Sequence, residues 1–165
     1  MTSQSGRGWS ERVLHNFGNG EDGQLPFANG GSLVRDTAGN LYGTTYLGGP
    51  LANGTAFELV RLPGGSWKEN ILYDGNDGQR PQSGLIFDSA GNLYGTTNYP
   101  CGVVFKLVPA SNGAWSEETV YYFGKKSTDG CSPSGNIVFD PSGNLFGSTQ
   151  NGGAHDWGIV WEIMH

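Results

Sequence analysis

The chain repeats one motif three times at a constant interval. In each copy an apolar run ends at Asp, a Gly-Asn pair follows after two residues, and a second apolar run leads into a Gly-Thr-Thr or Gly-Ser-Thr triplet. The central glycines, Gly39, Gly91 and Gly143, follow one another at intervals of 52 residues. The copies span 33–45, 85–97 and 137–149. Because a period of this size is typical of β-propeller blades, the repeat predicts an all-β fold of three similar units.

The centre of each motif predicts a β-hairpin. The Asp carboxylate can accept local backbone N–H groups, and Gly supplies the left-handed conformation that a type I turn with a bulge requires. We interpret the three aspartates as turn residues, since a catalytic group would have no reason to occur three times. They are Asp36, Asp88 and Asp140.

Two more strands follow the hairpin in the repeat. The third strand starts at a glycine and alternates apolar with polar positions, which marks a half-buried strand. The fourth opens with tryptophan and carries charges that would protect an outer sheet edge. We therefore expect four-stranded blades. Third strands are predicted at 54–59, 102–107 and 158–163, and fourth strands at 67–73 and 115–123.

The third copy has no fourth strand of its own. It ends at His165, whereas Trp9 opens an orphan copy of the fourth strand at 9–17. Three blades are too few, because closed propellers have about four to eight. We expect a homodimer in which blade-to-blade edges close a six-bladed ring and each N-terminal strand completes the partner's last blade. A nine-bladed trimer and a segment of a longer array are the alternatives.

This organisation divides the chain into a flexible N-terminal segment and a half-propeller. The predicted bounds are 1–8 for the flexible segment, 9–165 for the half-propeller, and about 32–74, 84–123 and 136–163 for its three blades.

Composition excludes some partners. The net charge is -6, and Lys125-Lys126 is the one basic cluster, which argues against binding to a nucleic-acid backbone. No apolar run approaches the roughly 18 residues that span a bilayer, so we expect no membrane insertion. Residues 1–8 lack the apolar core of a signal peptide. Abundant aromatic, Asn, Gly and Thr residues favour a secreted or cell-surface origin, with the signal peptide absent from this chain.

These motifs, above all 84–97, resemble the bacterial tandem repeats called GloVer repeats, which occur in exported proteins. The resemblance extends through Asp77-Gly78, Pro81, 102–107 and Trp115. It covers nearly the whole chain and implies a propeller-like repeat. It implies no particular reaction, cofactor or catalytic residue.

The loops at one mouth of the predicted tunnel carry the candidate site residues. Asp22, Asp77 and Asp129 each precede Gly; they stabilise turns or bind a divalent metal such as calcium. His155-Asp156 has no counterpart in the other copies and is either an ordinary surface loop or a general base or metal ligand.

Two unrelated residue types complete the candidates. His15 takes the place of Tyr73 and Tyr121, which packing explains better than chemistry. Cys101 and Cys131 lie on loops of neighbouring blades and are either a disulfide or free structural thiols, because their spacing of 30 residues matches no zinc signature.

Three functions remain open. The first is a binding module for a glycan or another small ligand, with contacts from Tyr46, Asn98, Tyr99, Gln150 and Trp157. The second, by analogy with other propellers, is a metal-dependent hydrolase of esters, lactones or phosphotriesters. The third is a repeat scaffold without a small-molecule site. No nucleophile elbow, zinc-protease helix, Walker loop or dinucleotide fingerprint is present.

Overall fold

A computed structural model describes residues 8–26, 32–76 and 78–165, which form fourteen strands in four sheets and no helix. None of these described residues belongs to a helix that could cross a bilayer. The prediction of an all-β repeat fold is therefore confirmed. The strands are β1 (Gly23–Gln24), β2 (Val34–Arg35), β3 (Leu41–Thr45), β4 (Leu47–Gly48), β5 (Thr55–Arg61), β6 (Trp67–Tyr73), β7 (Gln79–Pro81), β8 (Ile86–Phe87), β9 (Leu93–Tyr99), β10 (Val103–Pro109), β11 (Trp115–Tyr122), β12 (Gly130–Phe139), β13 (Leu145–Gly152) and β14 (Val160–Ile163).

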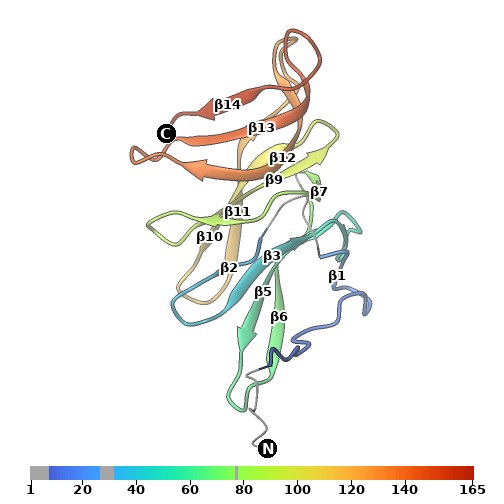
Figure 1. Cartoon of the computed structure of the whole chain (residues 1–165), viewed down its shortest axis with the longest axis vertical. Helices are drawn as coiled ribbons and strands as arrows, with labels where there is room; N and C mark the ends of the chain where they lie inside the picture. The colour runs from blue at the N-terminus through green and yellow to red at the C-terminus, as the bar shows by residue number, and fades with distance from the viewer. Residues whose placement is uncertain (1–7, 27–31, 77) are drawn as a thin grey trace, which may run out of the picture.

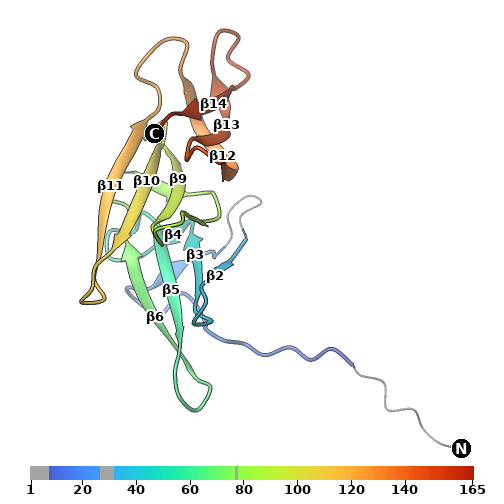
Figure 2. The same ribbon diagram turned by 90° about the vertical axis from the view of Figure 1, so that its left-hand side faces the viewer.

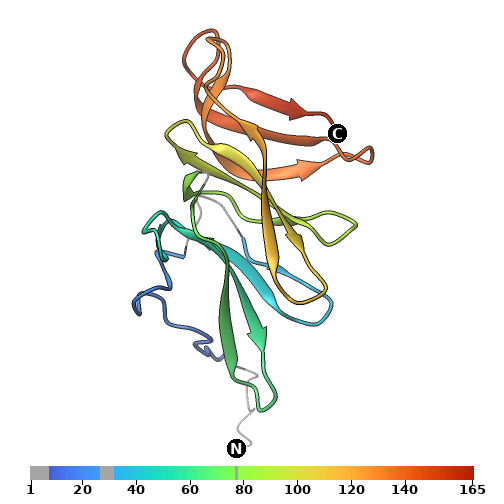
Figure 3. The same ribbon diagram turned by 180° about the vertical axis from the view of Figure 1, so that it is seen from behind.

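Each repeat forms its own antiparallel sheet. The first has the order β2-β3-β5-β6, the second β11-β10-β9-β7 with β8 also on β9, and the third β12-β13-β14. β1 and β4 make a separate two-stranded sheet beside the first repeat. Figures 1 and 3 show the three repeat sheets following one another along the long axis, with the first and third repeats at opposite ends.

The hairpin turns form as their chemistry predicts. In every copy the Asn N–H donates to the Asp Oδ1, and the Asn amide donates to Oδ2. The backbone N–H distances are 2.8 Å for Asn40–Asp36, 2.9 Å for Asn92–Asp88 and 2.9 Å for Asn144–Asp140. The turn glycines have φ between 86° and 92°, a region that costs little only for glycine. These aspartates are therefore structural.

The hydrophobic core lies between the repeats. One cluster joins the first repeat to the second through Tyr42, Ala56 and Leu85, and another joins the second to the third through Val104 and Trp161. An aromatic ring at or just after the end of each of the outer strands β6 and β11 packs on the third strand of the next repeat. These ring pairs are Tyr73–Phe105 at 4.7 Å and Phe123–Trp161 at 5.6 Å.

Successive repeats also meet through one backbone contact. The Arg80 N–H donates to the Asn53 carbonyl at 2.8 Å, and the Ser132 N–H donates to the Cys101 carbonyl at 2.8 Å. Arg80, Ser132 and Leu25 share positive φ values of 62°, 58° and 57°. The proline after Arg80 or Ser132 lies against a glycine of the previous repeat, where a Cβ atom would come within 2.7 Å of the proline ring. A side chain larger than that of Gly therefore strains the backbone there.

The predicted outer strand at 9–17 does not form in the single chain. These residues carry no strand assignment, and Figure 2 shows the beginning of the segment projecting away from the sheets. Its later part lies against the first repeat, where Phe17 packs on Phe57 with ring centroids 4.9 Å apart. The physical reason is that a strand needs a partner edge, and the β14 edge lies at the other end of the molecule. Residues 1–7 of the predicted flexible segment lie outside the described residues.

Candidate functional site

Both ends of the row of repeats expose apolar side chains at positions that are buried between repeats. Val160 is 84% exposed, whereas its counterparts Ala56 and Val104 are fully buried. At the other end Leu33 is 56% exposed, whereas its counterpart Leu85 is buried. We call the surface around Val160 and Met164 the tail face, and the surface around Leu33 and Pro26 the head face. Contiguous exposed apolar surface is a common feature of interaction sites.

The tail face ends in an open strand edge. β5 pairs with β6 and β10 pairs with β11, whereas β14 pairs only with β13 among the described residues. The His165 N–H donates to Asn144 Oδ1 at 3.1 Å, as the Arg61 N–H does to Asn40 at 3.3 Å. The third strand therefore ends in the same register in both repeats. Its free edge is a template for another strand.

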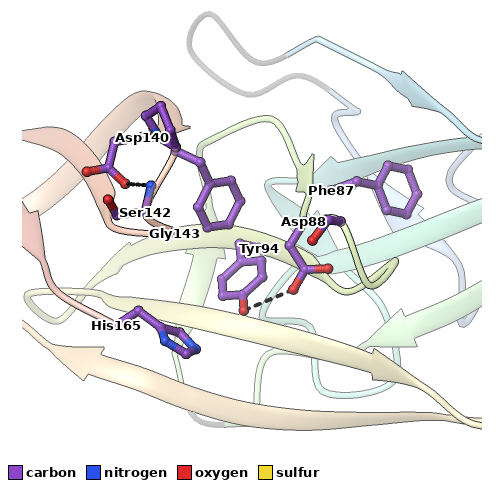
Figure 4. Close-up of a pocket in the computed structure, with 10 residues that line it drawn as sticks. Phe87, Asp88, Tyr94, Asp140, Ser142, Gly143 and His165 are labelled. Atoms are coloured by element: carbon purple, nitrogen blue, oxygen red, sulfur yellow. Dashed lines mark hydrogen bonds between the residues drawn. The ribbon is translucent and has the colours of Figure 1, made fainter.

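A cavity of about 390 Å³ lies beside this edge, between the turns of the second and third repeats (Figure 4). A second cavity of about 290 Å³ adjoins it on the side of β14. Both are lined by Tyr94, Phe139 and His165. Burial, followed by the charge of Asp88, raises the pKa of Tyr94 to about 12, so its hydroxyl stays protonated and donates to Asp88 at 3.3 Å.

The equivalent space between the first two repeats is occupied. There Trp115 packs on Tyr42 with ring centroids 6.1 Å apart, and Phe87 packs on the same ring at 5.2 Å. At the second junction Phe139 packs on Tyr94 at 5.1 Å, but among the described residues the third sheet has no strand beyond β14 and so no counterpart of Trp115. The two cavities therefore lie beside Tyr94, the counterpart of the tyrosine on which Trp115 packs at the first junction.

A second group of polar side chains lies under the N-terminal segment. His15 Nε2 is 3.1 Å from Asp22 Oδ2 and 3.5 Å from Glu69 Oε2, and all three side chains are largely buried. Burial raises the pKa of Glu69, the charge of Asp22 raises it further, and His15 opposes both. The sequence pointed to Asp22 as a metal ligand, but it gave no reason to connect Asp22 with His15 or Glu69.

Two of the predicted metal ligands, Asp22 and Asp129, have different surroundings in the part of the chain that the structure describes. Asp22 joins the group with His15 and Glu69, and no described ligand group includes Asp129. The Asp129 carboxylate instead accepts the Tyr121 hydroxyl at 3.1 Å and its neighbouring backbone N–H groups. Asp77 lies outside the described residues.

The predicted ligand contacts separate into two groups. Arg80 lies over the rings of Tyr46 and Tyr99, with its guanidinium carbon 5.8 and 4.9 Å from their centroids. Asn98 adjoins them, and its carbonyl accepts the Ser132 hydroxyl at 3.3 Å. Gln150 and Trp157 are exposed on the third repeat.

The remaining candidates have different outcomes. His155 and Asp156 are exposed, and within the described ranges neither side chain makes a hydrogen bond or ion pair. This pair therefore gains no support as a catalytic group. Cys101 and Cys131 are joined in a disulfide, which ties the second repeat to the third.

The comparisons identify the repeat and no activity. No curated protein matches the chain. A family model described as the Gloeobacter/Verrucomicrobia repeat matches residues 2–165, as the resemblance of the motifs predicted. The chain therefore belongs to the Gloeobacter/Verrucomicrobia repeat family.

Proposed function

We propose that this chain is a self-assembling scaffold, half of a six-bladed β-propeller that closes by pairing with a second copy. The observation that carries the proposal is the exposure of Val160 and Leu33 at positions that are buried at both internal junctions. If the head face of one copy packs on the tail face of another, these side chains meet as Ala56 and Leu85 do in one cluster of the core. Each chain then lends both faces, and two equal contacts close the ring.

The N-terminal segment supplies the missing strand in this arrangement. In the second repeat, Trp115 pairs with Pro109 and contacts Tyr42 of the repeat before it. Their counterparts at the tail are His165 and Tyr94, which line the open cavity. Trp9 is fully exposed in the single chain. A partner's Trp9, placed opposite His165, enters that cavity while its strand pairs with β14.

The backbone joint between repeats fits the same arrangement. Leu25 already has the positive φ of Arg80 and Ser132, and Pro26 follows it. Gly158 has the positive φ of 87° that its counterparts Gly54 and Gly102 share. Pro26 of one copy can therefore lie on Gly158 of the other without a change in either backbone.

Removing the Trp9 side chain tests this proposal. Trp9→Ala deletes a side chain that is exposed in the monomer and buried twice in the ring, so we expect dimer dissociation to become at least about 100-fold easier. Sedimentation velocity over a concentration series measures this change. Tyr122→Ala is the matched control, since it removes an exposed ring on the middle repeat. Equal association of wild type and Trp9→Ala would contradict the proposal.

A glycan-binding surface is the second candidate, and one observation favours it. The exposed Arg80 holds two rings, Tyr46 and Tyr99, on the side of the sheets where the predicted tunnel mouth lies. Rings and fixed polar groups are the features of small-ligand sites. Titration with neutral oligosaccharides, compared between wild type and Tyr99→Ala, tests it. Oligosaccharide binding by the wild type that is lost in Tyr99→Ala supports the site. Equal binding by the two proteins contradicts it.

An exported origin is also part of the proposal. The Cys101–Cys131 disulfide supports it, because disulfides persist in oxidising compartments.

A further inference from the structure

Three side chains from distant parts of the sequence converge beneath the N-terminal segment. One ligand atom each from His15, Asp22 and Glu69 can be chosen so that all lie within 4.8 Å of one another. His15 precedes the first turn, Asp22 precedes β1, and Glu69 lies on the outer strand β6. The group therefore connects the N-terminal segment to the first repeat.

One carboxylate oxygen of Glu69 lacks a partner in this group. Its side chain is 10% exposed, and its Oε1 atom is buried with no hydrogen-bond partner among the described residues. A buried carboxylate oxygen without a partner destabilises the fold unless a cation or a hydrogen-bond donor compensates it. Two carboxylates beside one imidazole leave this small volume short of positive charge.

The other two ligand groups are already oriented. Asp22 Oδ1 accepts the backbone N–H groups of Gly18 at 2.6 Å and Asn19 at 3.0 Å, and the other oxygen, Oδ2, faces His15. The His15 ring packs edge-on against Phe17, with centroids 4.6 Å apart. Such outer contacts fix the direction of metal ligands.

Histidine is not required here by the fold. The corresponding residues of the other repeats are Tyr73 and Tyr121, and the Tyr121 hydroxyl donates to Asp129 at 3.1 Å, the distance between His15 and Asp22. A tyrosine thus makes the structural hydrogen bond at this position. His15 adds a nitrogen that can bind a metal ion, which the phenol at the other positions does not offer.

We propose that His15, Asp22 and Glu69 bind one divalent transition-metal ion of the zinc type. Tetrahedral ligands about 2.0–2.1 Å from Zn²⁺ lie about 3.4 Å apart, which agrees with the two measured separations of 3.1 and 3.5 Å. An imidazole with few oxygen ligands suits such an ion better than Ca²⁺, which takes six to eight oxygens. The ion pins the N-terminal segment to β6 and so holds the segment that carries Trp9.

The metal site goes beyond the proposed self-assembly. It can be tested independently of dimer formation, because all three ligands belong to one chain. Metal-free protein is titrated with ZnCl₂ by calorimetry, and the thermal midpoint is measured with and without Zn²⁺. The variants are His15→Tyr, which installs the residue of the other repeats, and Glu69→Gln. Asp129→Asn changes the corresponding aspartate of the third repeat and is the matched control.

Saturable binding of one Zn²⁺ per chain, weakened at least tenfold in His15→Tyr and Glu69→Gln but kept in Asp129→Asn, is the expected result. Circular dichroism shows whether each variant is folded, and His15→Tyr is expected to remain folded because tyrosine fits the same position twice. No saturable binding by the wild type, or equal binding by wild type and His15→Tyr, overturns the metal site. Repeating the ZnCl₂ titration on Trp9→Ala distinguishes failure of the metal site from failure of dimer formation, because that variant keeps all three metal ligands.

Discussion

Replacing Val160 by lysine is expected to separate the two copies without unfolding either one. Val160 is 84% exposed in the single chain, so the change costs the monomer at most about 0.5 kcal/mol. Its counterparts are fully buried, so the side chain loses its exposure at each of two contacts in the ring. At about 1.5 to 3 kcal/mol for each buried valine, the dimer loses about 3 to 6 kcal/mol. Dissociation then becomes roughly 10²- to 10⁴-fold easier.

A charge swap makes the assay specific for head-to-tail contact. Leu33→Glu alters the opposite face and is expected to dissociate the dimer as Val160→Lys does. Mixing the two variants forms one contact with both wild-type residues and another with Lys facing Glu, so sedimentation velocity should show dimers in the mixture. Leu62→Lys, on the β5–β6 hairpin, is the control for added charge. A dimer that survives Val160→Lys, or a mixture that stays monomeric, would refute the reasoning.

Three further predictions concern the fold itself. The pKa of Asp88 lies below its usual value, because hydrogen bonds from Asn92, Ala90 and Tyr94 together outweigh the upward effect of burial. Ionised Asp88 therefore contributes fully to the free energy of unfolding above the ordinary Asp pKa of about 4. This contribution is lost as the pH falls through the lower pKa that Asp88 has in the folded protein. Urea unfolding from pH 6 to 3 should show this loss, with a smaller slope in Asp88→Asn; an unchanged slope would be contrary evidence. Gly102→Ala should lower the free energy of unfolding by about 2 kcal/mol or more, because its Cβ would overlap the Thr97 carbonyl at positive φ, whereas Gly91→Ala, with open space around it, should cost about 1 kcal/mol. Reducing the Cys101–Cys131 disulfide should lower the free energy of unfolding by about 3 to 4 kcal/mol, because the unfolded chain is no longer constrained by a loop of 30 residues. An unaltered urea midpoint would argue against that value.

Local chemistry made much of the fold predictable. The turns at Gly39, Gly91 and Gly143 follow from residues within five positions of one another, and the structure contains all three. The outer strands were predicted at 67–73 and 115–123 from an opening tryptophan and charged residues, and the structure has them at 67–73 and 115–122. In the third repeat β12 begins at Gly130, ahead of the predicted blade bound of about 136, just as β7 precedes the bound of 84 in the second repeat. Glycine and proline there hide a strand whose positive φ at Ser132 belongs to the joint between repeats.

The candidate sites were harder to predict because they depend on contacts between distant residues. His15 and Glu69 are 54 positions apart, and repeat comparison alone assigned His15 to packing. Only the fold shows that β6 carries Glu69 to the same place. The cavity beside β14 likewise depends on how the second and third repeats pack together, which no local pattern around Tyr94 or Phe139 reveals.

The molar mass in solution tests the central claim most directly. Light scattering on the purified wild-type chain at micromolar concentration should give about twice 17.6 kDa. The same measurement on Val160→Lys should give the mass of one chain. A wild-type mass of one chain at every concentration would contradict pairing, and a mass of three chains would replace the six-bladed ring with a nine-bladed one.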